Sequence, residues 1–82
     1  MIFREVRYKG ERMTNEDAVA LVQCAMRFDS EVTLESGARK MNGKSLMGVI
    51  SLALQAGDGV TVIAHGDDET AAVDAVAQQL GK

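Results

Sequence analysis

Residues 28–54 read FDSEVTLESGARKMNGKSLMGVISLAL, and the first half of this stretch decides the fold class. Residues 31–35 alternate between polar and apolar side chains, which is typical of a strand with one buried face. Ser36-Gly37 supplies a turn, and residues 38–41 provide a short partner strand. This half of the stretch therefore predicts a hairpin with one solvated face.

A short helix is expected after the hairpin. The run from Leu46 to Leu54 is strongly apolar, contains no proline and follows the loop Asn42-Gly43, so Ser45 stands where an N-cap is expected. Gly57-Asp58-Gly59 is expected to end this helix. One side of so apolar a helix must pack against the protein, while part of its other side can remain as a surface for a partner.

The residues before the hairpin predict a first strand and a first helix. The strand's apolar face consists of Ile2, Val6 and Tyr8. Phe3 falls on the other face and leaves the register open. The helix is expected over residues 15–27, with Thr14 as its N-cap and Asp17 three positions on. Its apolar stripe has helical spacing and consists of Ala18, Leu21, Val22 and Ala25.

The C-terminal part predicts one more strand and one more helix. Residues 60–64 are rich in β-branched side chains, and a helix opened by Asp67 or Asp68 follows. The apolar side of that helix consists of Ala72, Val73, Val76 and Leu80. The order βαββαβα predicts a single domain over residues 1–82, an α+β open-faced sandwich with a four-stranded antiparallel sheet and three helices on one face.

Composition narrows the class of protein. The net charge of −3 argues against a nucleic-acid surface, and no apolar stretch approaches the roughly 18 residues of a membrane span. Cys24 is the only cysteine, which excludes an intramolecular disulfide and a cysteine-rich metal site. Gly43-Lys44-Ser45 lacks the earlier glycine of a phosphate-binding loop. We expect a cytoplasmic protein without a cofactor, bound to neither membrane nor nucleic acid.

Three stretches resemble HPr, the small phosphocarrier of the bacterial sugar phosphotransferase system. They are LVQCAMRFDSEVTLE from Leu21, NGKSLMGVISL from Asn42 and VTVIAHGDDETAAVDAVAQQL from Val60. The most specific motif is KSLMG, residues 44–48. The resemblance implies that Ser45 is the target of an HPr kinase/phosphorylase. It also implies that Lys44, Leu46, Met47, Ile50, Thr14 and Glu16 lie on the partner-binding surface.

The phosphohistidine motif of the family, Gly-Leu-His-Ala-Arg-Pro-Ala, aligns with residues 12–18, where only Ala18 is unchanged. Thr14 occupies the histidine position, Glu16 the arginine position and Asp17 the proline position. A threonine hydroxyl without a neighbouring base is a poor nucleophile, and acids at a helix start repel phosphate. We therefore expect no histidine phosphotransfer and no catalytic residue.

Paralogues of HPr that lack the active histidine act with a catabolite-control transcription factor, so the resemblance implies a regulatory binding protein of carbon metabolism. Glu16 stands where those paralogues have an arginine that helps to bind the repressor. Two other hypotheses remain open at this point. One is a phosphocarrier that uses Thr14 or His65, and the other is an interaction domain without phosphorylation.

His65 and the acids that follow it, Asp67, Asp68 and Glu69, could in principle bind a metal. Acids at a helix start also complement the helix dipole, and we favour capping and a solvated turn over a metal site. For the assembly, we expect a monomer or a homodimer that exchanges its first strand through the joint Lys9-Gly10-Glu11.

Overall fold

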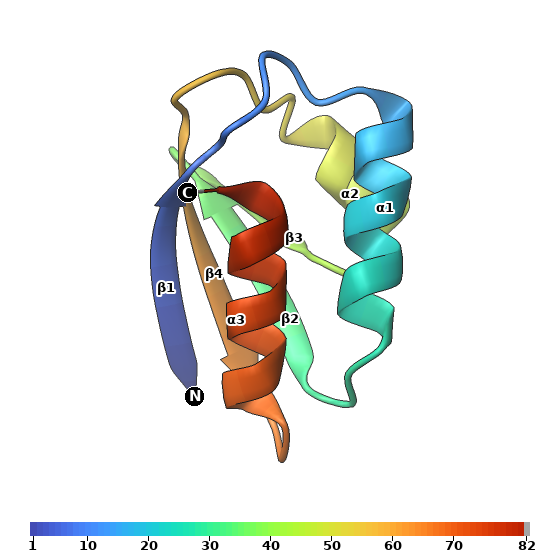
Figure 1. Cartoon of the computed structure of the whole chain (residues 1–82), viewed down its shortest axis with the longest axis vertical. Coiled ribbons are helices and arrows are strands. Elements are labelled where there is room, and N and C mark those ends of the chain that lie inside the picture. The colour runs from blue at the N-terminus through green and yellow to red at the C-terminus, as the bar shows by residue number, and fades with distance from the viewer. Residues whose placement is uncertain (82) are drawn as a thin grey trace.

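The computed structural model describes residues 1–81 as a four-stranded antiparallel sheet with three helices on one face (Figure 1). In chain order the elements are β1 (Ile2–Arg7), α1 (Asn15–Met26), β2 (Glu31–Ser36), β3 (Arg39–Asn42), α2 (Leu46–Ser51), β4 (Gly59–His65) and α3 (Glu69–Leu80). The predicted order and the α+β open-faced sandwich are confirmed. No helix in this part of the chain is long and apolar enough to cross a membrane.

The sheet has the strand order β1-β4-β2-β3, so β4 pairs on both sides. Val62 lies between Arg4 of β1 and Leu34 of β2 in the registers of the two pairs. The buried residues of β4 alternate along the strand and are Val60, Val62 and Ala64. Phe3 is 58% exposed and pairs with Ile63 on the solvent face, which settles the register that the sequence left open.

The core lies between the sheet and the helices. Each long helix contributes the apolar stripe predicted from its spacing, and the buried residues of α3 are Ala72, Val73, Val76, Ala77 and Leu80. Leu34 and Val62 are fully buried on the sheet side of the same core. Burying one such side chain contributes about 1.5–3 kcal/mol, so these stripes determine which face of the sheet the helices cover.

Several boundaries differ from the prediction by a single residue; strand β3, for example, begins and ends one residue later, at Arg39 and Asn42. The largest difference is in α2, which ends at Ser51 rather than Leu54. The helix stops because Ala53 adopts a left-handed backbone with φ 48°, which returns buried Leu54 to the core. The Leu54 carbonyl then accepts a hydrogen bond from the Met13 backbone N–H at 2.9 Å. An apolar run can continue past a helix when the chain after it is also buried.

Asp68 occupies the N-cap position of α3, but its side chain makes no capping hydrogen bond to the helix. Its carboxylate instead accepts hydrogen bonds from the Asp29 and Ser30 N–H groups, both at 2.9 Å, and from the Ser30 hydroxyl at 2.5 Å. The hydroxyl of buried Ser30, followed by the Asp29 N–H, lowers the pKa of Asp68. The expected capping role is therefore wrong for this side chain, which ties α3 to the start of β2.

Asp68→Asn should lower the melting temperature near neutral pH, because an amide cannot accept these hydrogen bonds as a carboxylate does. The folded pKa of Asp68 is depressed, so its stabilisation is present above the unfolded value of about 3.9 and is lost as pH falls through the folded pKa. The difference in melting temperature between about pH 7 and about pH 3 should therefore shrink in the variant. Thermal unfolding followed by circular dichroism measures both effects.

Asp67→Asn is the matched control, since it removes the same charge from the neighbouring exposed residue. Equal losses in the two variants would show that general charge, rather than the tie to Ser30, stabilises this corner.

Candidate functional site

The start of α1 is closed by its own side chains. The Thr14 hydroxyl accepts the Asp17 N–H at 3.1 Å, and the Asp17 carboxylate accepts the Thr14 N–H at 3.0 Å. This reciprocal capping box confirms Thr14 as the predicted N-cap. As a result, the hydroxyl that the resemblance places at the position of the phosphorylated histidine already accepts a hydrogen bond from the helix backbone.

The phenol of Tyr8, a buried residue just after β1, lies close to Asp17. Hydrogen bonds from the backbone and then the side chain of Thr14 are the main causes that lower the pKa of Asp17, and the Tyr8 phenol adds to them. Burial, followed by the charge of Asp17, raises the pKa of Tyr8. At the start of α1, Asp17 therefore stays ionised, and Tyr8 beside it stays protonated.

Glu16 adds a second, exposed carboxylate to the first turn of α1. Free N–H groups at a helix start attract phosphate, and the dipole favours negative charge there. Here two acidic side chains already supply that charge, and one of them is hydrogen-bonded into the cap. The arrangement opposes the approach of a phosphoryl group.

Ser45 caps α2 as predicted. Its backbone is extended, with φ −100° and ψ 115°, and its hydroxyl accepts the Gly48 N–H at 3.1 Å. A side chain at Gly48 would place a Cβ only 3.3 Å from that hydroxyl and 3.4 Å from the Cβ of Met41. The cap is half-buried and closely packed.

Lys44, immediately before the cap, is tied to another part of the chain. Its ammonium donates a hydrogen bond to the Phe28 carbonyl at 2.6 Å, and its backbone N–H donates to the Asn42 side chain at 2.9 Å. The ammonium thereby holds the loop before α2 against the segment that follows α1. This lysine has a structural partner in addition to any role in binding.

Helices α1 and α2 pack together and both carry exposed apolar side chains, and we call this surface the α1–α2 flank. Of α2, Met47 is 75% and Leu46 38% exposed, while Ile50 is partly buried. Of α1, Met26 is 62% and Val19 39% exposed. Sequence reasoning found the α2 residues and missed Val19 and Met26. The signal was their spacing, since with Val22 they form an apolar line beside the buried stripe.

Val19 and Met26 lie on the side of α1 away from α3, because Ala20 and Cys24, on the opposite side of the helix, line the space between α1 and α3.

The structure also places Thr14 and Ser45 at opposite ends of α2. The residue before Thr14 bonds to Leu54, beyond the end of α2, whereas Ser45 caps its start. Six helical residues span about 9 Å, so the flank lies between the two positions.

His65 ends β4, opposite Glu31 of β2, at the end of the sheet remote from the start of α1 (Figure 1). Glu69, near it, accepts the Gly66 N–H at 3.2 Å. Within residues 1–81, no group of three or more His, Cys, Asp or Glu side chains is placed to hold a metal. The structure thus separates the single imidazole from Thr14.

A family model described as the PTS HPr component phosphorylation site matches residues 14–81, beginning at the capping threonine. The chain belongs to the HPr family. It is 45% identical over 73 residues to the HPr-like protein Crh of Bacillus subtilis, and this match covers 89% of this chain and 85% of that protein. The match supports the family resemblance found in the sequence.

Solved HPr structures share the fold over nearly the whole chain. HPr-C-His from Thermoanaerobacter tengcongensis superposes with a TM-score of 0.91 at 32% identity, covering 98% of this chain and 91% of that one. Bacillus subtilis Crh, described as a domain-swapped, intertwined dimer, gives a TM-score of 0.77 at 42% identity and covers 88% and 80%. The sequence is thus more similar to Crh, while the shape superposes better on HPr.

Proposed function

We propose that this chain is a cytoplasmic regulatory protein of the HPr family that relays no phosphate through histidine and is not itself an enzyme. We further propose that phosphorylation at Ser45 switches its binding to a partner protein. The observation that carries the first part is the Thr14–Asp17 capping box at the family's phosphohistidine position.

Loss of the carrier role follows from the chemistry of that helix start. A hydroxyl needs a base to become a nucleophile, and the carboxylate bonded to Thr14, that of Asp17, is a weak base because its hydrogen bonds lower its pKa. Phosphothreonine is also a stable ester, unlike the phosphoramidate of phosphohistidine. Glu16 and Asp17 would repel the incoming phosphoryl group as well.

Ser45 suits a switch because it lies at the junction of a helix start and an apolar surface. A phosphate there adds about −1.5 to −2 charges, and its oxygens can accept hydrogen bonds from the first-turn N–H groups of α2. The same charge stands beside Leu46 and Met47, the most exposed part of α2. A partner that docks on the α1–α2 flank can therefore distinguish the phosphorylated from the free protein.

The partners we propose are an HPr-type kinase/phosphorylase and a catabolite-control transcription factor. The support is the similarity to Crh, one structure of which is described as a catabolite repression protein. Glu16 departs from the arginine of such paralogues and places a negative charge near one end of the flank. We expect this charge to weaken the contact with a repressor that was selected to meet an arginine.

The purified protein should not accept phosphate from phosphoenolpyruvate and the general phosphotransferase enzymes. Thr14→His alone should restore little transfer because Glu16 and Asp17 still repel phosphate, and adding Glu16→Arg should increase the rate. Acid-labile phosphate, quantified by mass spectrometry of the intact protein, is the measurement. Stoichiometric phosphohistidine at His65, or phosphate on Thr14 of the unmodified protein, would overturn the proposal. Equal rates for the single and double variants would show that Glu16 is irrelevant.

An HPr-type kinase should phosphorylate wild type and leave Ser45→Ala unmodified. Phosphorylated wild type should bind a classical catabolite repressor at least tenfold more tightly than free protein, the effect of about 1.4 kcal/mol, and Glu16→Arg should tighten binding further. Titration by calorimetry measures these affinities. Because loss of the cap alone costs about 0.5–2 kcal/mol of stability, Ser45→Thr is the control that keeps a capping hydroxyl. A kinase that ignores Ser45 would reduce this serine to a helix cap.

For the assembly, we propose that monomers exchange β1 to form a swapped dimer. The segment after β1 turns tightly around the buried Tyr8 ring, and a Cβ at Gly10 would lie 2.8 Å from the Tyr8 hydroxyl. Gly10→Ala should strain this turn and raise the dimer fraction, measured by size-exclusion chromatography with light scattering. Gly59→Ala is the matched control, since a Cβ there meets open space. An unchanged dimer fraction in Gly10→Ala would contradict the proposed hinge.

A further inference from the structure

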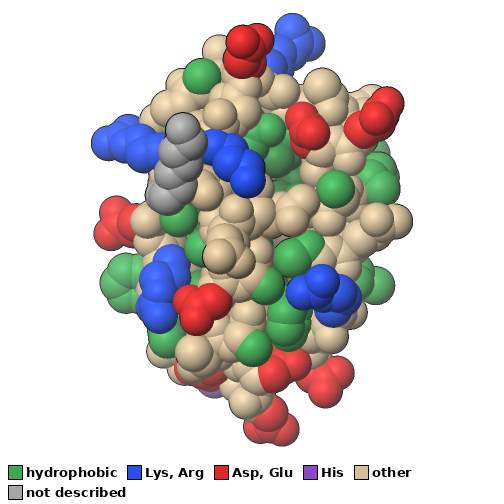
Figure 2. Space-filling model, in the orientation of Figure 1, with side chains coloured by type: hydrophobic (Ala, Val, Ile, Leu, Met, Phe, Trp, Pro, Cys, Tyr) green, Lys and Arg blue, Asp and Glu red, His purple; other side chains and the backbone are tan. Residues whose placement is uncertain are grey.

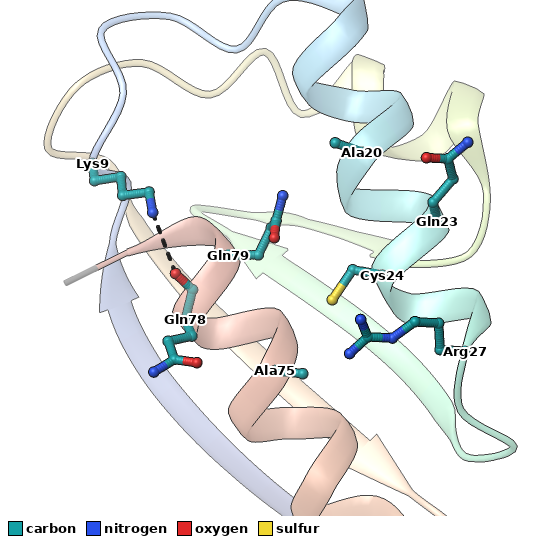
Figure 3. Close-up of a pocket in the computed structure, with 8 residues that line it drawn as sticks. All are labelled: Lys9, Ala20, Gln23, Cys24, Arg27, Ala75, Gln78 and Gln79. Carbon is teal, nitrogen blue, oxygen red and sulfur yellow. Dashed lines mark hydrogen bonds between the residues drawn. The ribbon is translucent and has the colours of Figure 1, made fainter.

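An open groove of about 500 Å³ runs between α1 and α3, on the other side of α1 from the α1–α2 flank (Figure 3). Small side chains line it, namely Ala20 and Cys24 of α1 and Ala75 of α3. Figure 3 shows Lys9 and Arg27 toward opposite ends of the groove, with the Arg27 guanidinium directed across toward α3. We call this feature the α1–α3 groove.

The charge of the groove is opposite to that of the chain. Asp and Glu outnumber Lys and Arg by 12 to 9, yet two cations and no carboxylate line the groove. Arg27 lies over the ring of Phe28, 5.3 Å from its centre, and forms no salt bridge within residues 1–81. Among the described residues, the Lys9 ammonium has only the Gln78 carbonyl as a partner, at 3.5 Å. Both cations can therefore accept an anionic partner without breaking an ion pair within residues 1–81.

The acidic side chains of the two helices lie outside the groove lining. Asp17 is held in the capping box, and Asp74 pairs with Arg4 at 3.4 Å. Glu16 belongs to the first turn of α1, and further acids gather with Glu69 around the start of α3. Figure 2 shows acidic side chains clustered at the lower edge of this face, where Figure 1 places the turn between β4 and α3.

The shape of the groove favours an extended chain over a small molecule. Small-molecule sites generally enclose most of the ligand surface, whereas this groove is largely open to solvent. The length of the groove also fits such a chain. Helix α1 rises about 10 Å from Ala20 to Arg27, and residues three apart on one side of a polyproline II segment are spaced by about 9 Å. Side-chain amides at Gln78 and Gln79 can both donate to and accept from a peptide backbone.

We propose that the α1–α3 groove binds an acidic, extended segment of a partner protein, with Lys9 and Arg27 each engaging one carboxylate. The surface is separate from the α1–α2 flank and does not require phosphorylation of Ser45. Its recognition is electrostatic, so binding weakens as salt concentration rises.

The test uses the full chain and a short fluorescein-labelled peptide with two glutamates three positions apart, titrated by fluorescence anisotropy at low ionic strength. Amide chemical-shift mapping should place the peptide at Ala20, Cys24 and Ala75. Lys9→Gln and Arg27→Gln should each weaken binding about threefold to fivefold, as expected for one exposed charge pair. Arg39→Gln, the same charge change on exposed β3, should have little effect.

One further variant addresses shape, and a second peptide addresses charge. Ala75→Leu, which fills the groove without changing charge, should also weaken the peptide, with the amide spectrum of the free variant showing that it remains folded. A peptide with glutamines in place of the glutamates should bind weakly or not at all.

Several outcomes would overturn the proposal. These are equal losses in Arg27→Gln and Arg39→Gln, equal binding of the glutamine peptide, and unchanged binding in Ala75→Leu. Inorganic phosphate that displaces the peptide as effectively as unlabelled peptide does would indicate a simple anion site. Binding to anionic phosphatidylserine vesicles in preference to the peptide would indicate a membrane surface instead.

Discussion

The rest of the structure depends on β4, which pairs with β1 on one side and β2 on the other. Its alternating burial presents Val60, Val62 and Ala64 to one face, and α3 covers that face. The end of α3 then meets the end of β1, where the Lys9 N–H bonds the Leu80 carbonyl at 3.0 Å. This meeting brings Tyr8 to Asp17, so a central strand ultimately positions the start of α1.

The two helix starts on the α1–α2 side have opposite electrostatic character. At α1, Asp17 supplies a fixed negative charge that the cap itself holds. At α2 the cap is the neutral Ser45, and no acid lies in the first turn. A phosphate is therefore opposed at the first helix start and favoured by the dipole at the second. The difference arises from the side chains, since both caps have the same extended backbone and use a hydroxyl.

Local patterns predicted most of the fold and both helix caps. Alternation identified β2, β-branched side chains identified β4, and the pairs Thr14–Asp17 and Ser45–Gly48 follow directly from capping rules. The errors came from tertiary structure. Leu54 is buried outside the helix, and Asp68 turns away from its own helix to a residue 38 positions earlier in the chain. The α1–α3 groove joins segments about 50 residues apart in sequence, so no local pattern could reveal it.

Helix α1 carries two different surfaces because it packs against α2 on one side and against α3 on the other. On the side away from α3 its exposed side chains, Val19 and Met26, are apolar, as is Met47 of α2. Toward α3 they include Arg27 over small residues. Charge added at Ser45 falls on the first surface, and a partner confined to the groove gains nothing from it. A partner that spans both surfaces, however, couples them. Linkage is reciprocal, so the effect of one contact on the affinity of the other equals the effect of the second contact on the first. The rigid twelve-residue helix between the two surfaces fixes the geometry that such a partner must satisfy.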